Sequence, residues 1–484
     1  MSNLPRLSAT EASTSIKQGN LTAEEYVWSF LDRIERVESK LHSFITLNKE
    51  NALTSAKEID HKIKRREEVG TLAGITIGIK DNICTKGLTT TCASKMLENF
   101  IPPFNATVVE RLLSSGAIVI GKLNMDEFGM GSTTEYSRYG VTHNPWNLDY
   151  VPGGSSGGSG AAVSSCECTV SLGSDTGGSI RCPASFCSVI GLKPTYGSVS
   201  RFGLISYANS LEQIGPLCRT VEDVVLLMNT IAGKDTHDDT TSSTHYFPSL
   251  KINTDATVSS IGIVKELVEG SDPAVSKTIY ACLEKFREFG AHTTEISLSS
   301  VKHALPSYYA LATAEASSNL ARFDNIRYGF QFPSEGYEWN SYISKARSNF
   351  GEEVKRRILI GSYVLSSGYL SKYYLKARQL RSMLKQELLS NFKKYDMLVG
   401  PTMPILPFRI GEKVDDPLKM YLIDVDTVIA NLGGIPAITV PAGYSNNLPI
   451  GLQLMAGPYQ EQKLIDAAFL FQNTSTLSMR PSLY

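Results

Sequence analysis

Apolar and polar positions in the first part of the chain predict an amphipathic helix followed by a buried strand. In residues 22–42, apolar side chains recur at helical spacing, and Thr22 with Glu25 forms a capping box at the start of this segment. In residues 74–80, isoleucine occupies every second position, which is typical of a strand. Because the two patterns differ in period, we expect the chain to change from helix to strand between them.

The same change from helix to short buried strand recurs further along the chain. Residues 107–115 predict a helix closed by Gly116, and the apolar run 117–120 predicts a strand. The second half continues this pattern with a helical segment and two short strands, at 353–395, 397–399 and 437–440. Helices that alternate with short apolar strands indicate an α/β fold whose sheet is covered.

A stretch from residue 153 to 178 is dominated by glycine, serine and alanine. A low-complexity linker is one interpretation of this composition. However, strand-like runs flank the stretch, and apolar residues are spaced through it, namely Val163, Cys166, Val170 and Leu172. The small side chains therefore predict close packing of a helix and loops against backbone. The polar residues 234–256 are the better candidate for a linker or an exposed loop.

Composition and charge exclude several classes of function. The 484-residue chain has 47 basic and 48 acidic side chains and a formal net charge of −1, so it has no global attraction for nucleic acid or anionic membranes. If RNA is involved, we expect another component to hold it. No segment reaches the ~18 apolar residues of a membrane span. The N-terminus lacks the apolar core of a signal peptide, so we expect a cytoplasmic protein, or an organellar one if a presequence has been removed.

The eight cysteines indicate neither a disulfide framework nor a zinc site. Cys166 and Cys168 form a CxC pair, but no CxxC pair and no histidine-rich segment accompanies them. We therefore expect the cysteines to be buried, small apolar residues in a reducing compartment, and we expect no metal on this chain.

Two short motifs suggest chemistry but fit poorly. Residues 116–122 match the start of a phosphate-binding loop, yet Leu123 stands where Ser or Thr would hold magnesium, and the segment resembles a buried strand. Residues 153–157 match a nucleophile elbow, but no strand precedes them and no suitable histidine follows. A nucleotide-binding protein that uses residues 116–122 is one alternative function.

A stronger candidate site combines two serines in glycine-rich turns with one lysine. Ser179 follows Asp175-Thr-Gly-Gly, where backbone N–H groups free of bulky side chains can stabilise an oxyanion. Ser155 lies in an earlier glycine turn, and Lys80 ends the first predicted strand. Lys80 can act as a base only if burial lowers its pKa from ~10.4 by roughly 3 units, which the adjacent Asp81 would oppose. Taken singly, however, a lysine at a strand end is usually a surface charge, and serines in glycine runs usually belong to turns.

The order of the glycine-rich motifs resembles the amidase-signature family. Three segments carry this resemblance: Gly153-Gly-Ser-Ser-Gly-Gly-Ser, Gly173-Ser-Asp-Thr-Gly-Gly-Ser-Ile-Arg-Cys-Pro-Ala and Gly191-Leu-Lys-Pro-Thr. The resemblance implies a catalytic triad in which Ser179 is the nucleophile, Ser155 follows a cis peptide bond and relays the proton, and Lys80 accepts it. It also implies an oxyanion hole of backbone N–H groups around Thr176, Gly177, Gly178 and Ser179.

Further segments resemble one group within this family, the A subunits of aspartyl/glutamyl-tRNA amidotransferases, from about residue 20 to residue 475. These segments are 124–132, 140–147, 315–324 and 420–424. Val425-Asp426 and Cys182 depart from the usual pattern without touching the implied triad. The resemblance implies a glutamine donor bound by Gly131, Ser132, Tyr308, Tyr309, Arg357 and Asp424. Arg357 could instead be an exposed charge on a helix.

The resemblance also implies an architecture, namely one α/β domain over residues 1–484 with three α/β/α layers around a large mixed sheet. Within this domain, a helical segment 1–70 precedes the signature core 71–233. The polar loop 234–256 follows, and residues 257–484 return to the same sheet.

The implied activity is a glutaminase that supplies ammonia to a partner. That partner is a B subunit, which uses ATP and magnesium to convert mischarged Glu-tRNA(Gln) or Asp-tRNA(Asn), and a small C subunit joins them. The resemblance implies that the chain itself needs no cofactor, meets tRNA mainly through the B subunit and does not bind a membrane. Two further functions compete with this one, namely a stand-alone amidase for another amide and a catalytically silent scaffold.

Overall fold

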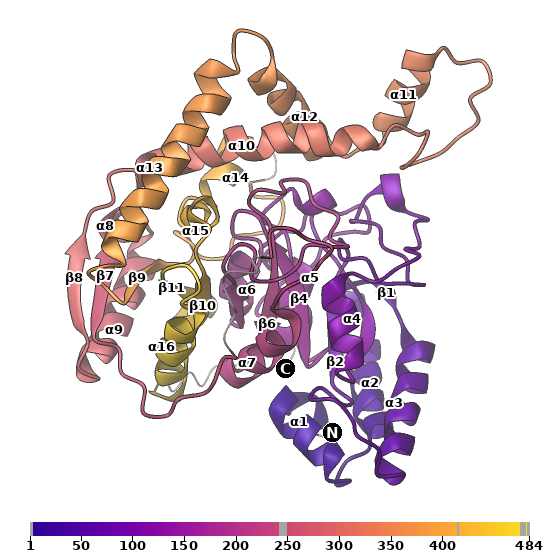
Figure 1. The fold of residues 1–484 in the computed structure, drawn as a ribbon, viewed down its shortest axis with the longest axis vertical. Coiled ribbons are helices and arrows are strands. Elements are labelled where there is room, and N and C mark those ends of the chain that lie inside the picture. Colours follow the sequence, from indigo (N-terminus) through magenta and orange to yellow (C-terminus); the bar gives the residue numbers. More distant parts are fainter. Residues whose placement is uncertain (1–2, 242–248, 414–415, 475–480, 482–484) are drawn as a thin grey trace.

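The computed structural model describes residues 3–241, 249–413, 416–474 and 481, which are built around one mixed sheet of eleven strands (Figure 1). Across the sheet the order is β1 (Phe44–Leu47), β3 (Ile118–Leu123), β2 (Thr76–Lys80), β4 (Val170–Asp175), β6 (Gln213–Cys218), β5 (Ile190–Lys193), β10 (Ala437–Ser445), β11 (Leu448–Met455), β9 (Met397–Pro401), β7 (Ser260–Val264) and β8 (His292–Ile296). Strand β2 pairs in parallel with β3 and β4, and β7 pairs in parallel with β8 and β9. The other pairs are antiparallel. Helices pack against this sheet, which confirms the predicted α/β/α fold class.

The helices of the first half are α1 (Ala9–Lys17), α2 (Ala23–Leu41), α3 (Lys49–Lys64), α4 (Thr107–Ser114), α5 (Gly157–Ser164), α6 (Arg181–Cys187) and α7 (Val221–Ile231). Those of the second half are α8 (Lys265–Glu269), α9 (Pro273–Glu288), α10 (Ala304–Asn319), α11 (Trp339–Arg347), α12 (Glu352–Leu365), α13 (Lys376–Asn391), α14 (Pro417–Leu422), α15 (Val428–Gly433) and α16 (Glu461–Thr474). Short 3-10 turns are η1 (Leu4–Arg6), η2 (Lys95–Leu97), η3 (Glu127–Gly129), η4 (Val301–His303) and η5 (Leu320–Arg322), and η6 (Ser371–Leu375) is a π-helical turn. None of these helices is long and apolar enough to cross a membrane.

The helix predicted over residues 22–42 is α2, and its start has the predicted cause. The Thr22 hydroxyl accepts a hydrogen bond from the Glu25 N–H at 3.1 Å, and the Glu25 carboxylate accepts one from the Thr22 N–H at 3.1 Å. This capping box satisfies two backbone donors that would otherwise lack partners. The strand predicted at 74–80 is β2, which is buried along its whole length.

The segment that matches a phosphate-binding loop is a strand interior. Residues 118–123 form β3, and the Lys122 amine is buried and donates to the Ile83 carbonyl and the Thr90 hydroxyl, each at 2.7 Å. A phosphate-binding loop must present its backbone N–H groups to a ligand, but in β3 they belong to the sheet. The nucleotide-binding alternative is therefore wrong for this segment.

The glycine-rich stretch is buried throughout, which confirms that it is not a linker. It contains α5, which packs against β2 and β4, and then β4 itself, while α6 begins three residues beyond it. Small side chains allow these elements to approach one another closely. The two candidate serines therefore lie inside the protein, at the connections that lead into α5 and α6.

The polar loop predicted at 234–256 is only partly described, because residues 242–248 lie outside the described part of the chain. Before that gap, Asp238 is buried and forms an ion pair of 2.8 Å with Arg201. After it, the chain enters β7, and strands β7 to β11 lie in the same sheet as β1 to β6. The segment thus leads from one part of the sheet to another.

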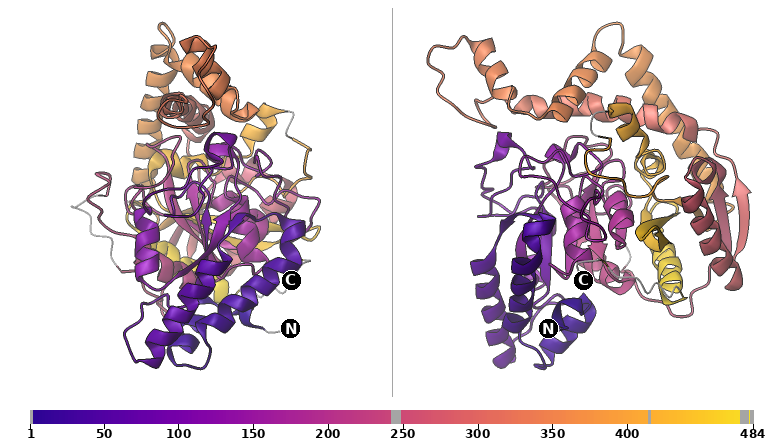
Figure 2. Two further views of the ribbon diagram at one scale, coloured as in Figure 1. Left: turned by 90° about the vertical axis from the view of Figure 1, so that its right-hand side faces the viewer. Right: turned by 180° about the vertical axis from the view of Figure 1, so that it is seen from behind.

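The helical pattern predicted at 353–395 corresponds to α12 and α13, which are separated by a turn and by η6. The predicted strands at 397–399 and 437–440 are β9 and the longer β10. Helices α10, α12 and α13 lie across one end of the molecule, above the edge of the sheet (Figures 1 and 2). Helix α10 also packs against α15, so this helical cap is anchored over the connection that follows β4.

Candidate active site

Lys80, the last residue of β2, is buried next to Ser155 and Ser174. Its Nζ atom lies 2.7 Å from Ser155 Oγ, 3.0 Å from Ser174 Oγ and 3.3 Å from the Ser174 carbonyl oxygen. Burial lowers the pKa of Lys80 to about 8, because a charged amine is poorly solvated in the interior. The structure therefore places a buried amine with a lowered pKa in contact with the Ser155 hydroxyl.

Asp81, which we expected to oppose this fall in pKa, points elsewhere. Its carboxylate accepts hydrogen bonds from the Thr91 N–H at 2.8 Å and the Thr91 hydroxyl at 2.5 Å, and it lies 3.6 Å from the Lys122 amine. That expectation was wrong because neighbouring residues at a strand end point in opposite directions. The acids whose charges favour a protonated Lys80 come from other segments, namely Glu212, Asp126 and Asp175.

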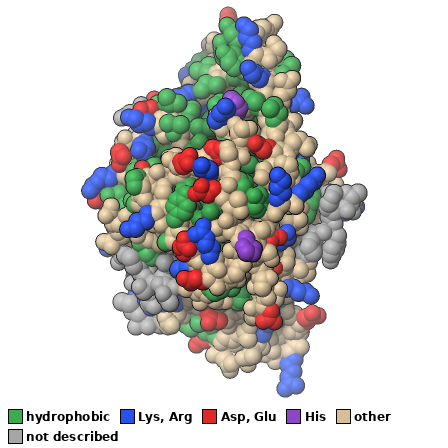
Figure 3. Space-filling view, turned by 90° about the vertical axis from the view of Figure 1, so that its left-hand side faces the viewer, with side chains coloured by type: hydrophobic (Ala, Val, Ile, Leu, Met, Phe, Trp, Pro, Cys, Tyr) green, Lys and Arg blue, Asp and Glu red, His purple; other side chains and the backbone are tan. Residues whose placement is uncertain are grey.

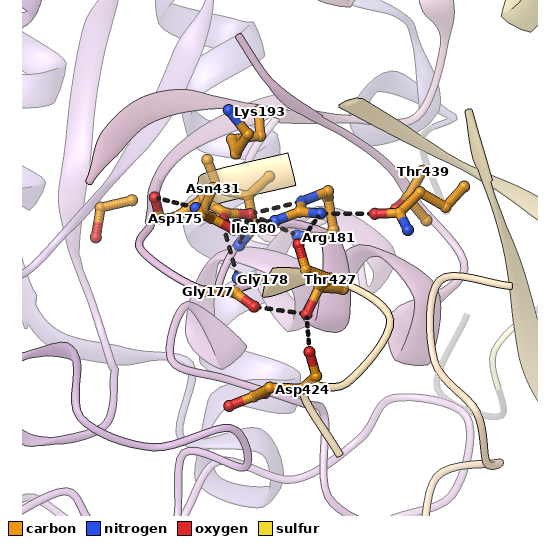
Figure 4. Close-up of polar contacts among 12 residues, drawn as sticks. Asp175, Gly177, Gly178, Ile180, Arg181, Lys193, Asp424, Thr427, Asn431 and Thr439 are labelled. Carbon is orange, nitrogen blue, oxygen red and sulfur yellow. Dashed lines mark hydrogen bonds and ion pairs between the residues drawn. The ribbon is translucent and has the colours of Figure 1, made fainter. Parts of the chain in front are cut away.

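Asp175, at the end of β4, organises the loop that carries Ser179. Its carboxylate accepts hydrogen bonds from the N–H groups of Gly178 at 2.8 Å and Ile180 at 3.1 Å, and it forms a buried ion pair of 3.0 Å with Arg181 (Figure 4). Burial opposes ionisation, but Arg181, Lys193 and Asn431 together outweigh it and hold the pKa of Asp175 below its usual range. The loop is thus wrapped around a fixed negative charge just before α6.

The segments of Ser155 and Ser179 are joined through backbone. The Ser156 N–H donates to the Ser179 carbonyl at 3.2 Å, and the Asp126 N–H donates to the Ser155 carbonyl at 3.2 Å. The peptide bond between Gly154 and Ser155 is cis, as the resemblance implies. A Cβ atom on Gly154 would lie 2.2 Å from Asp126 Oδ2, so only glycine fits where the Ser155 segment passes Asp126.

The expected oxyanion donors lie in a crowded turn. A side chain on Gly177 would meet the Tyr308 hydroxyl at 2.4 Å, and one on Gly178 would meet the Thr427 hydroxyl at 2.3 Å. Gly178 also has a φ of +136°, a conformation that only glycine adopts readily. Its N–H is bonded to Asp175, and that hydrogen bond competes with any oxyanion for this donor. Thr176 lies between Asp175 and Gly177 in the same turn.

Three of the residues expected to bind glutamine come together from distant parts of the chain. The Ser132 hydroxyl donates to Asp424 Oδ1 at 2.7 Å, and the Tyr309 hydroxyl donates to Asp424 Oδ2 at 2.8 Å. Burial raises the pKa of Asp424 to about 6. Gly131 serves close packing, because a Cβ atom there would lie 2.4 Å from the Asp126 side chain.

Arg357 is buried, so its interpretation as an exposed helix charge was wrong. Its guanidinium forms an ion pair of 2.7 Å with Glu353, one helical turn earlier, and lies over the rings of Tyr309 and Tyr421. These two rings stack at 4.1 Å. Arg357 therefore lies next to the Asp424 cluster, with its charge already partly balanced.

The remaining expected residue, Tyr308, points toward the catalytic loop. Its hydroxyl lies 2.9 Å from that of Tyr207 and close to Gly177. Tyr308 and Tyr309 are adjacent on α10, so this helix contributes one ring to the loop and the other to the Asp424 cluster. Among the described residues, no group of three or more His, Cys, Asp or Glu side chains could hold a metal ion. All eight cysteines are buried and unpaired.

Comparison with known proteins places the chain and its fold in a family. The family model for Amidase matches residues 25–465. This chain belongs to the amidase family. The A subunits of glutamyl-tRNA(Gln) amidotransferase from Desulforamulus reducens and Gloeothece citriformis are 48% and 50% identical to it. These alignments cover 99% of this chain and 100% of the relative in the first case, and 94% of both in the second.

Solved amidase structures share the same fold. The A subunit of glutamyl-tRNA(Gln) amidotransferase from Thermotoga maritima aligns with a TM-score of 0.82 at 36% identity, covering 99% of this chain and 98% of the other. The peptide amidase of Stenotrophomonas maltophilia also aligns with a TM-score of 0.82, at 26% identity and 98% coverage of each chain. Amidases that are named for different activities thus share this architecture.

Several residues of the candidate site were missed from the sequence. Ser174, which touches Lys80, lies inside a motif whose other residues attracted attention, and the alternation of β4 could have revealed its direction. Glu353 could have been found, because it precedes Arg357 at the spacing of a helical ion pair. By contrast, Thr427 and Asn431, which contact the loop from the far end of the chain, have no local signal.

Proposed function

We propose that this chain is the glutamine-hydrolysing amidase subunit of a tRNA-dependent amidotransferase. The observation that carries the mechanism is the 2.7 Å contact between the Lys80 amine and the Ser155 hydroxyl in a buried site. The choice among amidases is supported by relatives that span nearly the whole chain and are named as A subunits of glutamyl-tRNA(Gln) amidotransferase.

In the proposed reaction, Ser179 Oγ attacks the side-chain carboxamide carbon of glutamine. Its proton passes to Ser155 Oγ while the Ser155 proton passes to the neutral amine of Lys80, which becomes an ammonium. When the tetrahedral intermediate collapses, the proton returns along the same path to the departing nitrogen, and ammonia leaves. Water then attacks the glutamyl ester with the same relay, which releases glutamate and restores Ser179.

The protonation state of Lys80 limits this reaction. With a pKa of about 8, roughly a tenth of the molecules carry a neutral Lys80 near neutral pH. The rate of acyl-enzyme formation should therefore rise with pH until Lys80 is mostly neutral. An unperturbed lysine would supply a neutral amine hundreds of times less often at the same pH.

The donor pocket has charges that suit an α-amino acid. We assign the α-ammonium group of glutamine to Asp424, which is ionised above about pH 6, and the α-carboxylate to Arg357. Ser132 and Tyr309 hold the Asp424 carboxylate, and Tyr308 lies next to Gly177 of the catalytic loop. Because Glu353 already pairs with Arg357, the arginine has a fixed position before the substrate arrives.

The surface supports a protein partner. Besides the buried Arg357, residues 354–386 contain seven Lys and Arg residues and no acidic residue. The α12–α13 hairpin in this segment exposes several large apolar side chains, and hydrophobic and basic side chains gather at the upper end of the molecule (Figure 3). Exposed apolar groups of this density are typical of interaction sites. We assign the amide-accepting step, with ATP, magnesium and mischarged Glu-tRNA(Gln), to a B subunit, and we expect a small C subunit in the complex.

The test is glutamate release by the chain alone, with the B and C subunits, and with these subunits plus ATP and charged tRNA. We expect slow hydrolysis by the chain alone and activation at each addition, because ammonia released without an acceptor is lost. The activation should correspond to about 1–3 kcal/mol, the usual size of such coupling. The Ser179→Ala variant is the control for background hydrolysis. Equal rates in all three mixtures would contradict the proposed role in a complex.

A stand-alone amidase is the second candidate, and the peptide amidase of the same fold is the observation that favours it. The two candidates differ in substrate. Faster hydrolysis of a simple amide or a peptide amide than of glutamine, with no effect of the B subunit, would support the stand-alone enzyme. A scaffold without activity is the third candidate, and it predicts that Ser179 does not react with a serine-directed fluorophosphonate.

A further inference from the structure

Glu212, just before β6, is a buried acid with no role in the reaction described above. Its side chain is almost fully buried, and its Oε2 atom accepts a hydrogen bond of 2.5 Å from the Ser206 hydroxyl. Its Oε1 atom has no hydrogen-bond partner among the residues that the structure describes. A buried carboxylate oxygen without a partner is destabilising, so its presence needs a reason.

The hydrogen bonds of Ser174 supply that reason. Ser174 Oγ receives an N–H from Lys80 at 3.0 Å and another from the Asn82 side-chain amide at 2.9 Å. These two bonds use the acceptor capacity of the hydroxyl, so its own proton must be donated elsewhere. Burial raises the pKa of Glu212, while Ser206, the Lys80 charge and the Ser174 hydroxyl all act to lower it. Strands β4 and β6 pair with Ser174 opposite Ile214 and Asp175 opposite Gln213, so Ser174 and Glu212 are diagonal neighbours on one face of the sheet, a spacing that a long side chain can bridge.

We propose that Glu212 is a positioning residue for Lys80, acting through the hydroxyl of Ser174. This proposal rests on the proposed function of Lys80 as the base. Because the Ser174 proton is directed to Glu212, Ser174 Oγ can only accept from Lys80. A neutral Lys80 then donates its two N–H groups to Ser174 Oγ and to the Ser174 carbonyl. Its lone pair is left facing Ser155, 2.7 Å away.

Glu212 also stabilises the product of proton transfer. When Lys80 takes the proton of Ser155, a positive charge forms next to a fixed carboxylate, as the imidazolium does beside the aspartate of a Ser-His-Asp triad. No proton needs to reach Glu212 for this effect. Ser174 separates the carboxylate from the amine, so Glu212 favours the ammonium without forming a direct ion pair with it.

The other charged groups near Lys80 and Glu212 are occupied. Asp126 accepts backbone N–H groups of residues 134 and 136, and Asp175 is paired with Arg181. Cys92 and Tyr207 are buried near Glu212, and Arg201 forms its ion pair with Asp238. Among the acids that favour a protonated Lys80, Glu212 has the largest influence.

The first test compares Glu212→Gln with Glu212→Asp and the wild-type chain. We would measure the rate at which a fluorophosphonate labels Ser179 across about pH 6–10, a reaction that needs no glutamine and no partner. In Glu212→Gln, the labelling rate at the optimum should fall about 10- to 100-fold. The acid limb of its pH profile, which is the range where the labelling rate rises with pH, should also move to lower pH by on the order of one unit. The reason is that Lys80 loses a neighbouring negative charge. Glu212→Asp keeps the charge and should keep the acid limb.

Glu461→Gln is the matched control. Glu461 is also buried, with one oxygen bonded to the Thr195 N–H at 2.8 Å and the other without a partner among the described residues. Its charge acts on Lys193 and is not among the main influences on Lys80. We expect the acid limb of this variant to stay where it is in the wild-type chain.

An unshifted acid limb in a folded Glu212→Gln protein, or an equal shift in Glu461→Gln, would overturn the proposal. If Glu212→Gln does not fold, Ser174→Ala should lower the labelling rate to a similar extent and Ser174→Thr should restore it. Ser174→Ala at the wild-type rate would equally overturn it. A wild-type chain without any acid limb would refute the base role of Lys80, and the Glu212 proposal with it. Loss of glutamine hydrolysis alone, with labelling as expected, would count only against the proposed substrate.

Discussion

Replacing Lys80 with Met should abolish activity and also change how protein stability depends on pH. The folded protein lowers the pKa of Lys80 from 10.5 to about 8, whereas the unfolded chain restores the ordinary value. Between these two values the unfolded state binds more protons than the folded state. Stability therefore rises with pH across this window, because a buried amine no longer has to be charged.

A fall of roughly 2.5 pKa units corresponds to about 3 kcal/mol. The wild-type protein bears this full destabilisation below about pH 8 and is relieved of it above about pH 10.5. Met fills similar space without a charge, but it leaves the Ser155 and Ser174 oxygens short of a partner, which costs about 1–3 kcal/mol at every pH. Lys80→Met should thus be as stable as wild type or slightly more stable near neutral pH, and less stable near pH 10.5.

Urea titrations followed by tryptophan fluorescence, at several pH values between about 7 and 10.5, measure this effect. The quantity to compare is the difference in unfolding free energy between the two proteins, since other titrating groups cancel in it. We expect that difference to change by about 3 kcal/mol over the range. Lys193→Met is a positive control, because burial lowers the pKa of Lys193 to about 7. A difference that does not vary with pH would show that Lys80 keeps an ordinary pKa, and would refute its role as a neutral base.

Three further predictions follow from the site. Ser179→Ala should no longer react with a fluorophosphonate, and peptide mapping should find the wild-type label on Ser179; a label on Ser156 would contradict the assignment. Asp424→Asn should raise the KM for glutamine by about 10- to 100-fold with little change in kcat. In the wild-type chain, the KM should rise as the pH falls through about 6, because Asp424 becomes protonated. An unchanged KM in the variant would place the donor site elsewhere. Arg181→Met should lower the unfolding free energy by about 3–5 kcal/mol in urea titrations, because Asp175 is left charged and buried; a loss below about 1 kcal/mol would contradict this.

The features that the sequence predicted well are those with local causes. The start of α2 depends on two residues three positions apart, and the burial of β2 follows from its alternating isoleucines. The glycine-rich stretch was correctly expected to be packed, because apolar residues run through it. What composition alone did not reveal is the reason for the glycines. At Gly154, the space is taken by the carboxylate of Asp126, which comes from another segment.

The predictions that failed concern the direction of a side chain or contacts between residues that are distant in the sequence. Asp81 follows Lys80 in the chain, so proximity in sequence suggested an influence that the geometry removes. Glu212 lies far from Lys80 in sequence and has no motif that connects the two. Arg357 belongs to an amphipathic helix, and its burial depends on the rings of Tyr309 and Tyr421, which arrive from other helices. Pairings of this kind can be identified only once the fold is known.

The arrangement of buried charges explains how one lysine can remain a base inside this protein. Three pairs of buried charges around the site are fixed in direct ion pairs, namely Asp175 with Arg181, Glu353 with Arg357 and Asp81 with Lys122. A direct pair of that kind would hold Lys80 protonated, because an adjacent carboxylate favours the ammonium. Within the described residues Lys80 has no such ion pair; three serine oxygens surround its amine, and the Glu212 carboxylate lies behind one of them. The hydroxyl of Ser174 thus keeps the charge near enough to stabilise the ammonium once it forms and far enough to leave the amine neutral before it does.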